Sequence, residues 1–254
     1  MTTPLVLKMA YSRLSDQDRE RYDALYISAP NRMLPEELAI FRTNGFGFGA
    51  GNRRSGLFFT GSRFNHSCRP NVHRHWDEQK RCEWFIANRD VARGQELCIS
   101  YQEIRASEQT RRRDLGRGYG FDCACEACTL SEEETSVSNA RRVKIKSLDD
   151  STIAQRGRPD RLVPIVELVL QLLEEEDIST GAAELALDAL TSFICMGDEP
   201  SASRWIDRFL ELEKKQNGIW SSNYEQVAAW KGNLTRHPGW NFFGRTHGGH
   251  LDRR

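Results

Sequence analysis

The sequence predicts an α+β protein in which a strand-rich first half is followed by an all-helical second half. Between residues 56 and 101, apolar and polar residues alternate in short runs separated by turn residues, which is the pattern of half-buried strands. Beyond residue 160, apolar residues recur every three or four positions, which is the pattern of amphipathic helices. Six of the seven cysteines lie within residues 68–128, and such clustering in an intracellular chain favours metal binding or reactivity over disulfides.

The composition is that of an ordinary globular protein. The 254 residues are 39% hydrophobic and 28% charged, and 36 basic side chains balance 36 acidic ones. This balance favours neither nucleic acid nor anionic lipid as a partner. The most apolar stretch, residues 162–173, is shorter than the roughly 20 residues that cross a bilayer, and the N-terminus shows no secretory-signal pattern. We therefore expect an intracellular protein, nuclear or cytoplasmic, without membrane association.

The first half is expected to combine helices and strands. A helical insert is predicted at about residues 12–41, where leucine and tyrosine residues recur at helical spacing. The glycine-rich segment 44–51 that follows lacks the preceding strand and following helix of a dinucleotide-binding loop. A charged helix is expected over residues 105–115. Strands are predicted at 57–60, 72–76, 81–87 and 96–101, with residues 77–80 as a hairpin loop.

The second half is expected to consist of a linker, helices and a tail. Residues 131–159 are predicted to be a linker or a loose helix, because this segment is highly charged and offers little to bury. Residues 160–236 are predicted to form helical hairpins similar to tetratricopeptide repeats, although no strict repeat is present. Residues 237–254 are expected to form a flexible tail. The helices are placed at about 160–176, 180–195, 201–216 and 223–231.

Three cysteines are spaced so that one tight turn can direct them at a single ion. They are Cys123, Cys125 and Cys128, and tetrahedral zinc requires a fourth ligand from elsewhere in the chain. The candidates are a histidine or one of Cys68, Cys82 and Cys98. Cys68 is the preferred choice, because it lies in a turn-rich loop whereas the other two lie in strand-like runs. The alternative is a group of unrelated free thiols.

Three motifs in succession resemble the signatures of the SET-domain protein lysine methyltransferases, and the SMYD-like and fungal branch in particular. The resemblance covers roughly residues 40–130. It implies that residues 1–130 form a partial, β-rich SET-type domain with a post-SET zinc motif at 121–128. The motifs are Asn65-His-Ser-Cys-Arg-Pro-Asn71, Gly94-Gln-Glu-Leu-Cys-Ile-Ser-Tyr101 and Cys123-Ala-Cys-Glu-Ala-Cys128.

The resemblance also implies a function and the residues that carry it. The function is transfer of a methyl group from S-adenosylmethionine to a lysine of a protein substrate, histone or non-histone. Tyr101 would be the catalytic residue lining the lysine channel. The cofactor-binding residues would be Asn44, Asn65, His66, Tyr101 and Phe121. One structural zinc ion, with no ligand position left open for water, would be bound by Cys68, Cys123, Cys125 and Cys128.

The sequence departs from the family in one respect. The Gly-x-Gly element with which such domains begin is not found ahead of the first expected helix, and the glycines at 45, 47 and 49 follow the helical insert. The alternative function is therefore a catalytically impaired, zinc-stabilised SET-like module that acts as a scaffold, with a protein partner on its helical region.

Two further groups of residues have ordinary structural explanations. His73 and His75 share one face of a strand and are expected to be an exposed pair, because no third metal ligand is evident. The basic triplet Arg111–Arg113 is interpreted as a solvated helix face. One such triplet without interleaved aromatic residues gives no reason to expect direct nucleic-acid binding.

Overall fold

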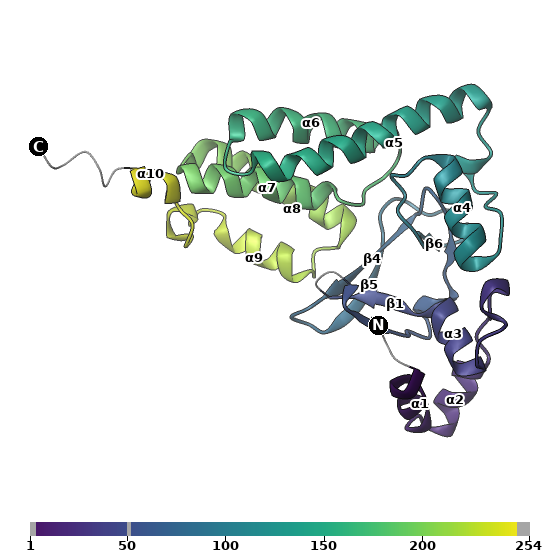
Figure 1. Cartoon of the computed structure of the whole chain (residues 1–254). Helices are drawn as coiled ribbons and strands as arrows, with labels where there is room; N and C mark the ends of the chain where they lie inside the picture. The colour runs from purple at the N-terminus through teal and green to yellow at the C-terminus, as the bar shows by residue number, and fades with distance from the viewer. Residues whose placement is uncertain (1–3, 50–51, 248–254) are drawn as a thin grey trace, which may run out of the picture.

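In the computed structural model, which describes residues 4–49 and 52–247, the strands lie between two groups of helices. Helices α1–α3 lie at one end of the molecule, and the larger group α5–α9 lies at the other (Figure 1). The α+β class predicted from the sequence is confirmed. No helix among the described residues has both the length and the apolar character to span a membrane.

The N-terminal helices pack around a small apolar core of their own. They are α1 (Pro4–Ser12), α2 (Asp16–Asp23) and α3 (Glu36–Asn44). Tyr22, Leu25 and Ile40 form the centre of this core. The helical insert expected near residues 12–41 is thus present, and its last helix ends at the glycine-rich segment.

Short strands pair two by two. Strand β1 (Phe46–Phe48) pairs with β2 (Arg54–Gly56), and β4 (Val72–Asp77) pairs with β5 (Cys82–Ala87), both antiparallel. The hairpin predicted around residues 77–80 is therefore confirmed. Strand β3 (Asn65–His66) pairs in parallel with β6 (Cys98–Ile99) through only two residue pairs.

The strand predicted at residues 57–60 is wrong, because this segment turns. Leu57 and Phe59 pack on the core of the N-terminal helices, whereas the ring of Phe58 lies 5.9 Å from that of Phe46 on β1. Side chains alternate between these two neighbours as they would in a strand, but no other strand in the described part of the chain pairs with this segment and the chain turns at residues 59–60. Residues 96–101 are likewise less regular than predicted, since only Cys98 and Ile99 pair.

Helix α4 (Glu108–Tyr119) begins at Ser107, whose hydroxyl accepts the backbone N–H of Thr110, and ends at Gly120. Gly120 has φ +74°, a conformation that glycine adopts without steric cost. Arg111 is buried and its Nη1 donates to the carbonyl of Ala106. The prediction of a solvated basic face is therefore wrong for Arg111.

Residues 131–159, predicted to be a linker or loose helix, instead contain the regular helix α5 (Glu132–Thr152), which packs along α6 (Figure 1). Ser131 and Glu134 form a reciprocal capping box at its start, a signal legible in the sequence. Arg142 and Ile145 are completely buried. The prediction of a linker followed from the small number of apolar residues in this segment. In the structure, the buried Arg142 forms part of the face of α5 that packs against the protein.

The remaining helices pack together around one apolar core. The backbone N–H of Asn241 donates to the carbonyl of Ile194 on α7. The segment from residue 237 to residue 247 is therefore attached to α7. Residues 248–254 of the expected tail lie outside the described residues. The helices are α6 (Pro159–Glu175), α7 (Ala182–Met196), α8 (Glu199–Gln216), α9 (Ser222–Trp230) and α10 (Phe242–His247).

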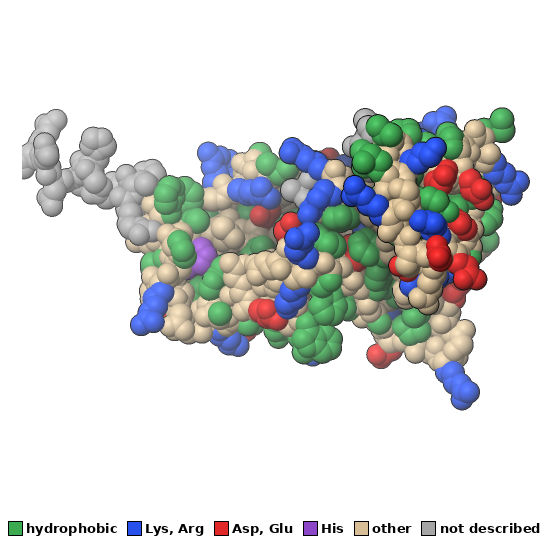
Figure 2. All heavy atoms as spheres, turned by 90° about the horizontal axis from the view of Figure 1, so that it is seen from below, with side chains coloured by type: hydrophobic (Ala, Val, Ile, Leu, Met, Phe, Trp, Pro, Cys, Tyr) green, Lys and Arg blue, Asp and Glu red, His purple; other side chains and the backbone are tan. Residues whose placement is uncertain are grey.

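Charges are unevenly distributed over the face shown in Figure 2. Basic side chains are spread along this face, and acidic side chains gather at the end of the molecule where the N-terminal helices lie in Figure 1. A surface of this kind is electrically mixed, as the balanced composition suggests.

The hairpin is joined to the helical region through Asp77. Its carboxylate accepts the backbone N–H of Ser222 at 2.9 Å and the Ser222 hydroxyl at 2.8 Å. It also accepts the N–H groups of Gln79 and Lys80 within the hairpin loop. Burial acts to raise the pKa of Asp77, but these hydrogen bonds to Lys80, Ser222 and Gln79 together lower the pKa below its usual value.

We predict that Asp77→Asn lowers the free energy of unfolding by about 1–3 kcal/mol near pH 7, because an amide leaves some of these donors unsatisfied. A carboxylate with a lowered folded-state pKa stabilises above its unfolded pKa and loses that contribution as the pH falls through the folded pKa. The difference from wild type should therefore shrink below about pH 4. Denaturant titrations at both pH values measure it. The exposed Asp90→Asn serves as control, and an equal loss at both pH values would contradict the prediction.

Candidate metal centre and cofactor pocket

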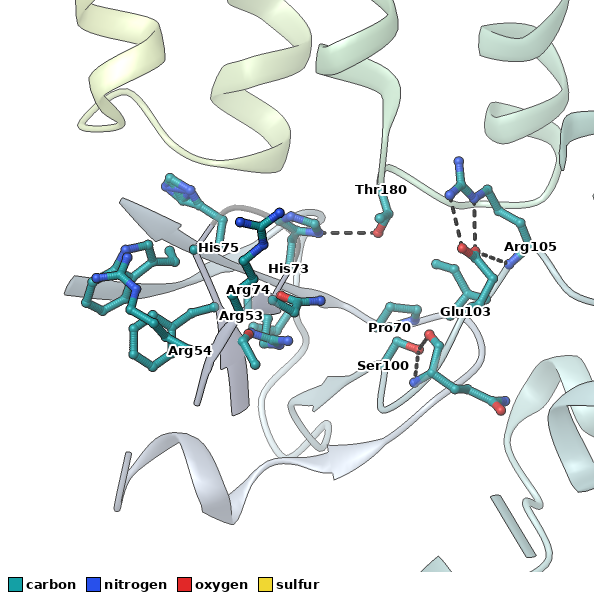
Figure 3. Close-up of a pocket in the computed structure, with 18 of the residues that line it drawn as sticks. Arg53, Arg54, Pro70, His73, Arg74, His75, Ser100, Glu103, Arg105 and Thr180 are labelled. Atoms are coloured by element: carbon teal, nitrogen blue, oxygen red, sulfur yellow. Dashed lines mark hydrogen bonds and ion pairs between the residues drawn. The ribbon is translucent and has the colours of Figure 1, made fainter. Parts of the chain in front are cut away.

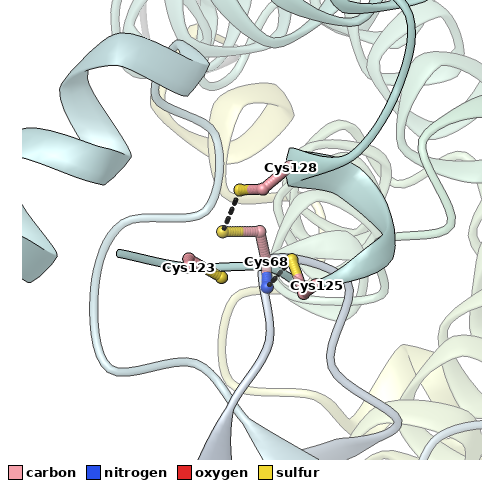
Figure 4. Close-up of side chains that lie close together, drawn as sticks. All are labelled: Cys68, Cys123, Cys125 and Cys128. Atoms are coloured by element: carbon pink, nitrogen blue, oxygen red, sulfur yellow. Dashed lines mark hydrogen bonds between the residues drawn. The ribbon is translucent and has the colours of Figure 1, made fainter. Parts of the chain in front are cut away.

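Four cysteine sulfurs converge on one point (Figure 4). The Sγ atoms of Cys68, Cys123, Cys125 and Cys128 all lie within 4.8 Å of one another. The Sγ atoms of Cys68 and Cys128 are 3.7 Å apart. Zinc–sulfur bonds of about 2.3 Å in a regular tetrahedron place the sulfurs about 3.8 Å apart. The cluster could therefore hold a zinc ion.

The four ligands come from two segments far apart in the chain. Cys68 lies in the loop after β3. Cys123 and Cys125 lie between α4 and the short helix η4 (Glu126–Cys128), and Cys128 ends that helix. Cys82 and Cys98, the alternative fourth ligands, lie on β5 and β6 outside this group. The structure thus brings together the four cysteines preferred from the sequence.

The sulfurs strongly influence one another's ionisation. Hydrogen bonds from the thiols of Cys128 and Cys68 lower the pKa of Cys125, and the backbone N–H of Cys68 also points at the Cys125 sulfur at 3.3 Å. The hydrogen bonds to Cys125 and Cys128, together with burial, raise the pKa of Cys68. The protein environment therefore favours the thiolate form of Cys125. A divalent cation is the natural counter-charge for additional thiolates.

His66 connects the cysteine cluster to Tyr101. The Nδ1 atom of His66 accepts the backbone N–H of Tyr101 at 3.0 Å, so its proton is assigned to Nε2, which lies 3.3 Å from the Cys68 sulfur. Burial lowers the pKa of His66 to about 4, which keeps the imidazole neutral near pH 7. The imidazole ring thus bridges the Cys68 sulfur and the Tyr101 backbone.

A cavity of about 360 Å³ lies next to this cluster, within the size range of small-molecule sites. Asn44, Asn65, Tyr101 and Phe121, predicted from sequence as cofactor-binding residues, all line it. His66, the fifth, lies behind the wall, with its ring centroid 5.3 Å from that of Tyr101. The structure therefore gathers all five at one place, and their binding of a cofactor is taken up below.

The two asparagines present defined groups to this cavity. Both N–H bonds of the Asn44 amide are used, one by the carbonyl of Tyr26 and one by that of Ile40, each at 2.8 Å. The Asn44 oxygen is consequently the atom left to accept a hydrogen bond. The amide nitrogen of Asn65 donates to Glu96 Oε1 at 2.6 Å. This hydrogen bond fixes the orientation of the Asn65 side chain.

The opposite wall is aromatic. Tyr101 packs on Tyr119 with ring centroids 4.7 Å apart, and Phe121 lies 6.4 Å from Tyr119. The Tyr101 hydroxyl donates to the carbonyl of Phe64 at 2.6 Å. Burial raises the pKa of Tyr101 to about 12, so the side chain is a neutral phenol at physiological pH.

A second, larger cavity of about 900 Å³ lies between the hairpin and the helical region. In Figure 3 the His73 side chain points across to Thr180, in the loop before α7, where their polar atoms are 3.3 Å apart. His73 and His75 both line this cavity, and burial lowers the pKa of His73 to about 3. The sequence-based expectation of an exposed pair is wrong, because both side chains are partly buried in the wall of this cavity and His73 contacts Thr180.

The two cavities meet. Gly47, Arg74 and Ser100 line both of them. Arg74 is held at this junction by Glu83 at 2.8 Å, and its guanidinium stacks over the ring of Phe46 at 4.9 Å. A molecule in the small cavity would therefore adjoin one in the larger cavity.

Several lining residues were not predicted from the sequence. Tyr119 could have been found as the aromatic residue that precedes Phe121 across a helix-ending glycine. Arg74 carried no signal of its own, because alternation on a strand does not reveal which face a cavity occupies.

The fold and the site define an α+β protein with a four-cysteine cluster beside a small cavity. The family model described as SET domain matches residues 9–102 of the chain. Relatives with this similarity are named as lysine methyltransferases, which supports the family that the sequence motifs predicted.

Three relatives show the extent of this similarity. Histone-lysine N-methyltransferase set5 of Schizosaccharomyces pombe is 25% identical over 235 residues, which cover 91% of this chain and 72% of the relative. Human protein-lysine N-trimethyltransferase SMYD5 is 34% identical over 88 residues, covering 34% of this chain and 21% of the relative. Potential protein lysine methyltransferase SET6 of Saccharomyces cerevisiae is 36% identical over 73 residues, covering 28% and 19%.

We predict that the purified chain contains close to one zinc per molecule, and that Cys68→Ser or Cys125→Ser greatly reduces this content. Each substitution removes one of the four zinc–sulfur bonds and leaves that position to a weaker oxygen ligand. Elemental analysis measures the metal, and treatment of the wild type with a strong chelator should lower its melting temperature, because binding free energy contributes to folding. Cys195→Ser, on α7, should retain the metal. Wild-type protein that lacks zinc after expression in zinc-replete medium would contradict the prediction.

Proposed function

We propose that the chain is an S-adenosylmethionine-dependent protein-lysine N-methyltransferase of the SET type. The observation that carries the proposal is the small cavity, which collects Asn44, Asn65, Tyr101 and Phe121 from four separate segments. These segments are tied to one another beside the cysteine cluster. Named relatives that act on lysine support the same reaction class.

The cavity offers groups that suit the proposed cofactor. The Asn44 oxygen, its amide hydrogens already used, can accept from the ammonium of the methionine part. Phe121, 37% exposed, and Tyr119 offer apolar faces for the adenine ring. Arg74 is the charged side chain of the lining and can meet a carboxylate. When bound, the cofactor supplies the methyl group on a sulfonium.

Tyr101 would act at the junction of donor and acceptor. As a neutral phenol whose proton is directed to Phe64, it presents oxygen lone pairs to a developing or departing positive charge. The attacking lysine must be deprotonated, and the aromatic wall of Tyr101 and Tyr119 disfavours its charged form. The remaining contribution is alignment of the amine with the methyl group.

The larger cavity would hold the polypeptide on either side of the target lysine. It adjoins the cofactor cavity at Gly47, Arg74 and Ser100, so a lysine side chain could reach from one to the other. Its wall is built from both the hairpin and the helical region, through His73 and Thr180. The substrate is accordingly proposed to be a protein, histone or non-histone.

Zinc is proposed to have a structural role. All four ligand positions would be filled by cysteine sulfur, so no position remains for a reacting water. The ion would join the loop after β3 to the segment after α4, and thereby fix Phe121 against the pocket.

We predict that Tyr101→Phe lowers the turnover number for methyl transfer by about 100-fold or more, because one preorganised polar group at the reacting centre is lost. Transfer of labelled methyl from S-adenosylmethionine to a protein extract measures it. Tyr224→Phe, on α9, is the matched control. Cofactor affinity should change little. Unaltered turnover in Tyr101→Phe would remove this residue from the mechanism.

We also predict that Asn44→Ala weakens cofactor binding by about tenfold, the equivalent of one hydrogen bond to a charged group. Calorimetric titration with S-adenosylhomocysteine gives the dissociation constants, and the exposed Asn233→Ala is the control. A wild-type chain that holds zinc but binds no cofactor would instead favour the scaffold function considered from the sequence.

A further inference from the structure

A fully buried ion pair lies where the helical region meets the loops that follow β3 and β6. Arg142 on α5 donates through Nε to Glu176, which follows α6, at 3.0 Å. Both side chains are 0% exposed. The Ser138 hydroxyl donates to the same Glu176 oxygen at 2.6 Å. Buried charges of this kind are tolerated only where they are paired and hydrogen-bonded.

The remaining nitrogens of Arg142 reach across to two loops that lead away from the pocket strands. Nη1 and Nη2 both lie 3.4 Å from the carbonyl oxygen of Cys68, and Nη1 also donates to the carbonyl of Ile104. Cys68 is two residues beyond β3, and Ile104 is five residues beyond β6. Because β3 and β6 pair through only two residues each, the guanidinium bridges the same two segments beyond the point where their pairing ends.

The end of α6 provides a second attachment to the Cys68 loop. Arg69 lies 3.6 Å from Glu176. Arg89 pairs with Asp177 and donates to the carbonyl of Arg69 at 2.9 Å. Glu176 thus contacts the side chain of Arg69, the residue that follows Cys68. Asp177 holds the backbone of Arg69 by way of Arg89.

We propose that Arg142 and Glu176 are positioning residues that hold the Cys68 loop against the loop after Tyr101, so that the helical region is a working part of the cofactor pocket. The proposal rests on the proposed function for its cofactor. Asn65 and His66 are joined to Tyr101 by the short ladder and by side-chain hydrogen bonds within the pocket. The bridge adds a link beyond the ladder, at the carbonyls of Cys68 and Ile104.

Arginine is required at this position for a geometric reason. Its planar fork places three nitrogens toward Glu176, Cys68 and Ile104 at once. Lysine retains the positive charge and can pair with Glu176, but its single nitrogen cannot satisfy that pair and both loop carbonyls in this arrangement. The substitution Arg142→Lys therefore keeps a positive charge beside the Glu176 carboxylate but removes the link between the two loops.

The test compares Arg142→Lys and Glu176→Gln with the control Glu175→Gln in the full chain. Glu175 is adjacent to Glu176 and pairs with Arg141, but its side chain is 36% exposed. Backbone hydrogen exchange is measured on peptides spanning residues 64–71, 101–107 and α7–α8, together with the dissociation constant for S-adenosylhomocysteine. We expect faster exchange in the two loops with α7–α8 unchanged, and at least tenfold weaker binding, in both positioning variants. The control should stay within twofold of wild type.

Other outcomes overturn the proposal. Unchanged loop exchange, unchanged cofactor affinity, or a uniform rise in exchange throughout the chain would each mean that the pair serves only general stability. If Arg142→Lys fails to fold, Glu176→Gln, which leaves an amide oxygen for Arg142 and Ser138, decides the question alone. If the wild type binds no cofactor, the proposed function fails, whereas loop exchange still shows whether the bridge positions these loops.

Discussion

The convergence of four sulfurs is the constraint on which the pocket depends. Cys68 follows β3, whereas the other three cysteines follow α4, more than fifty residues later. Among the described residues, no strand pairing joins the loop after β3 to the segment after α4. An ion bound by all four sulfurs would supply the missing cross-link and add its binding free energy to folding.

The chemistry beside this cluster depends on neutral groups. His66, between sulfur and pocket, is kept uncharged by burial, and Tyr101 is kept a phenol in the same way. Both effects follow from the cost of placing charge in a poorly solvated site. In the proposed reaction, the same environment would favour the neutral form of the lysine amine, which is the form able to attack a methyl group.

The helical region meets the rest of the chain through polar contacts as much as apolar ones. Arg142 and Glu176 are fully buried, and Asp77 joins the hairpin to Ser222. Desolvation makes such contacts poor sources of net stability, but each demands a specific geometry. They place the helices in one orientation relative to the loops, and that orientation closes the larger cavity over His73.

The sequence by itself determined the α+β class, the helices after residue 160, the hairpin around residues 77–80 and the residues that meet at the small cavity. Those conclusions rest on local periodicity and, for the cavity residues, on the resemblance of three motifs to a known family. The packing of helix α5, the partial burial of His73 and the ion pair of Arg142 were decided only by the tertiary structure. From the sequence alone, a charged side chain such as that of Arg142 is predicted to be exposed. Its partner Glu176 lies 34 residues away along the chain. Pairing at that distance is a property of packing, which leaves no local pattern in the sequence.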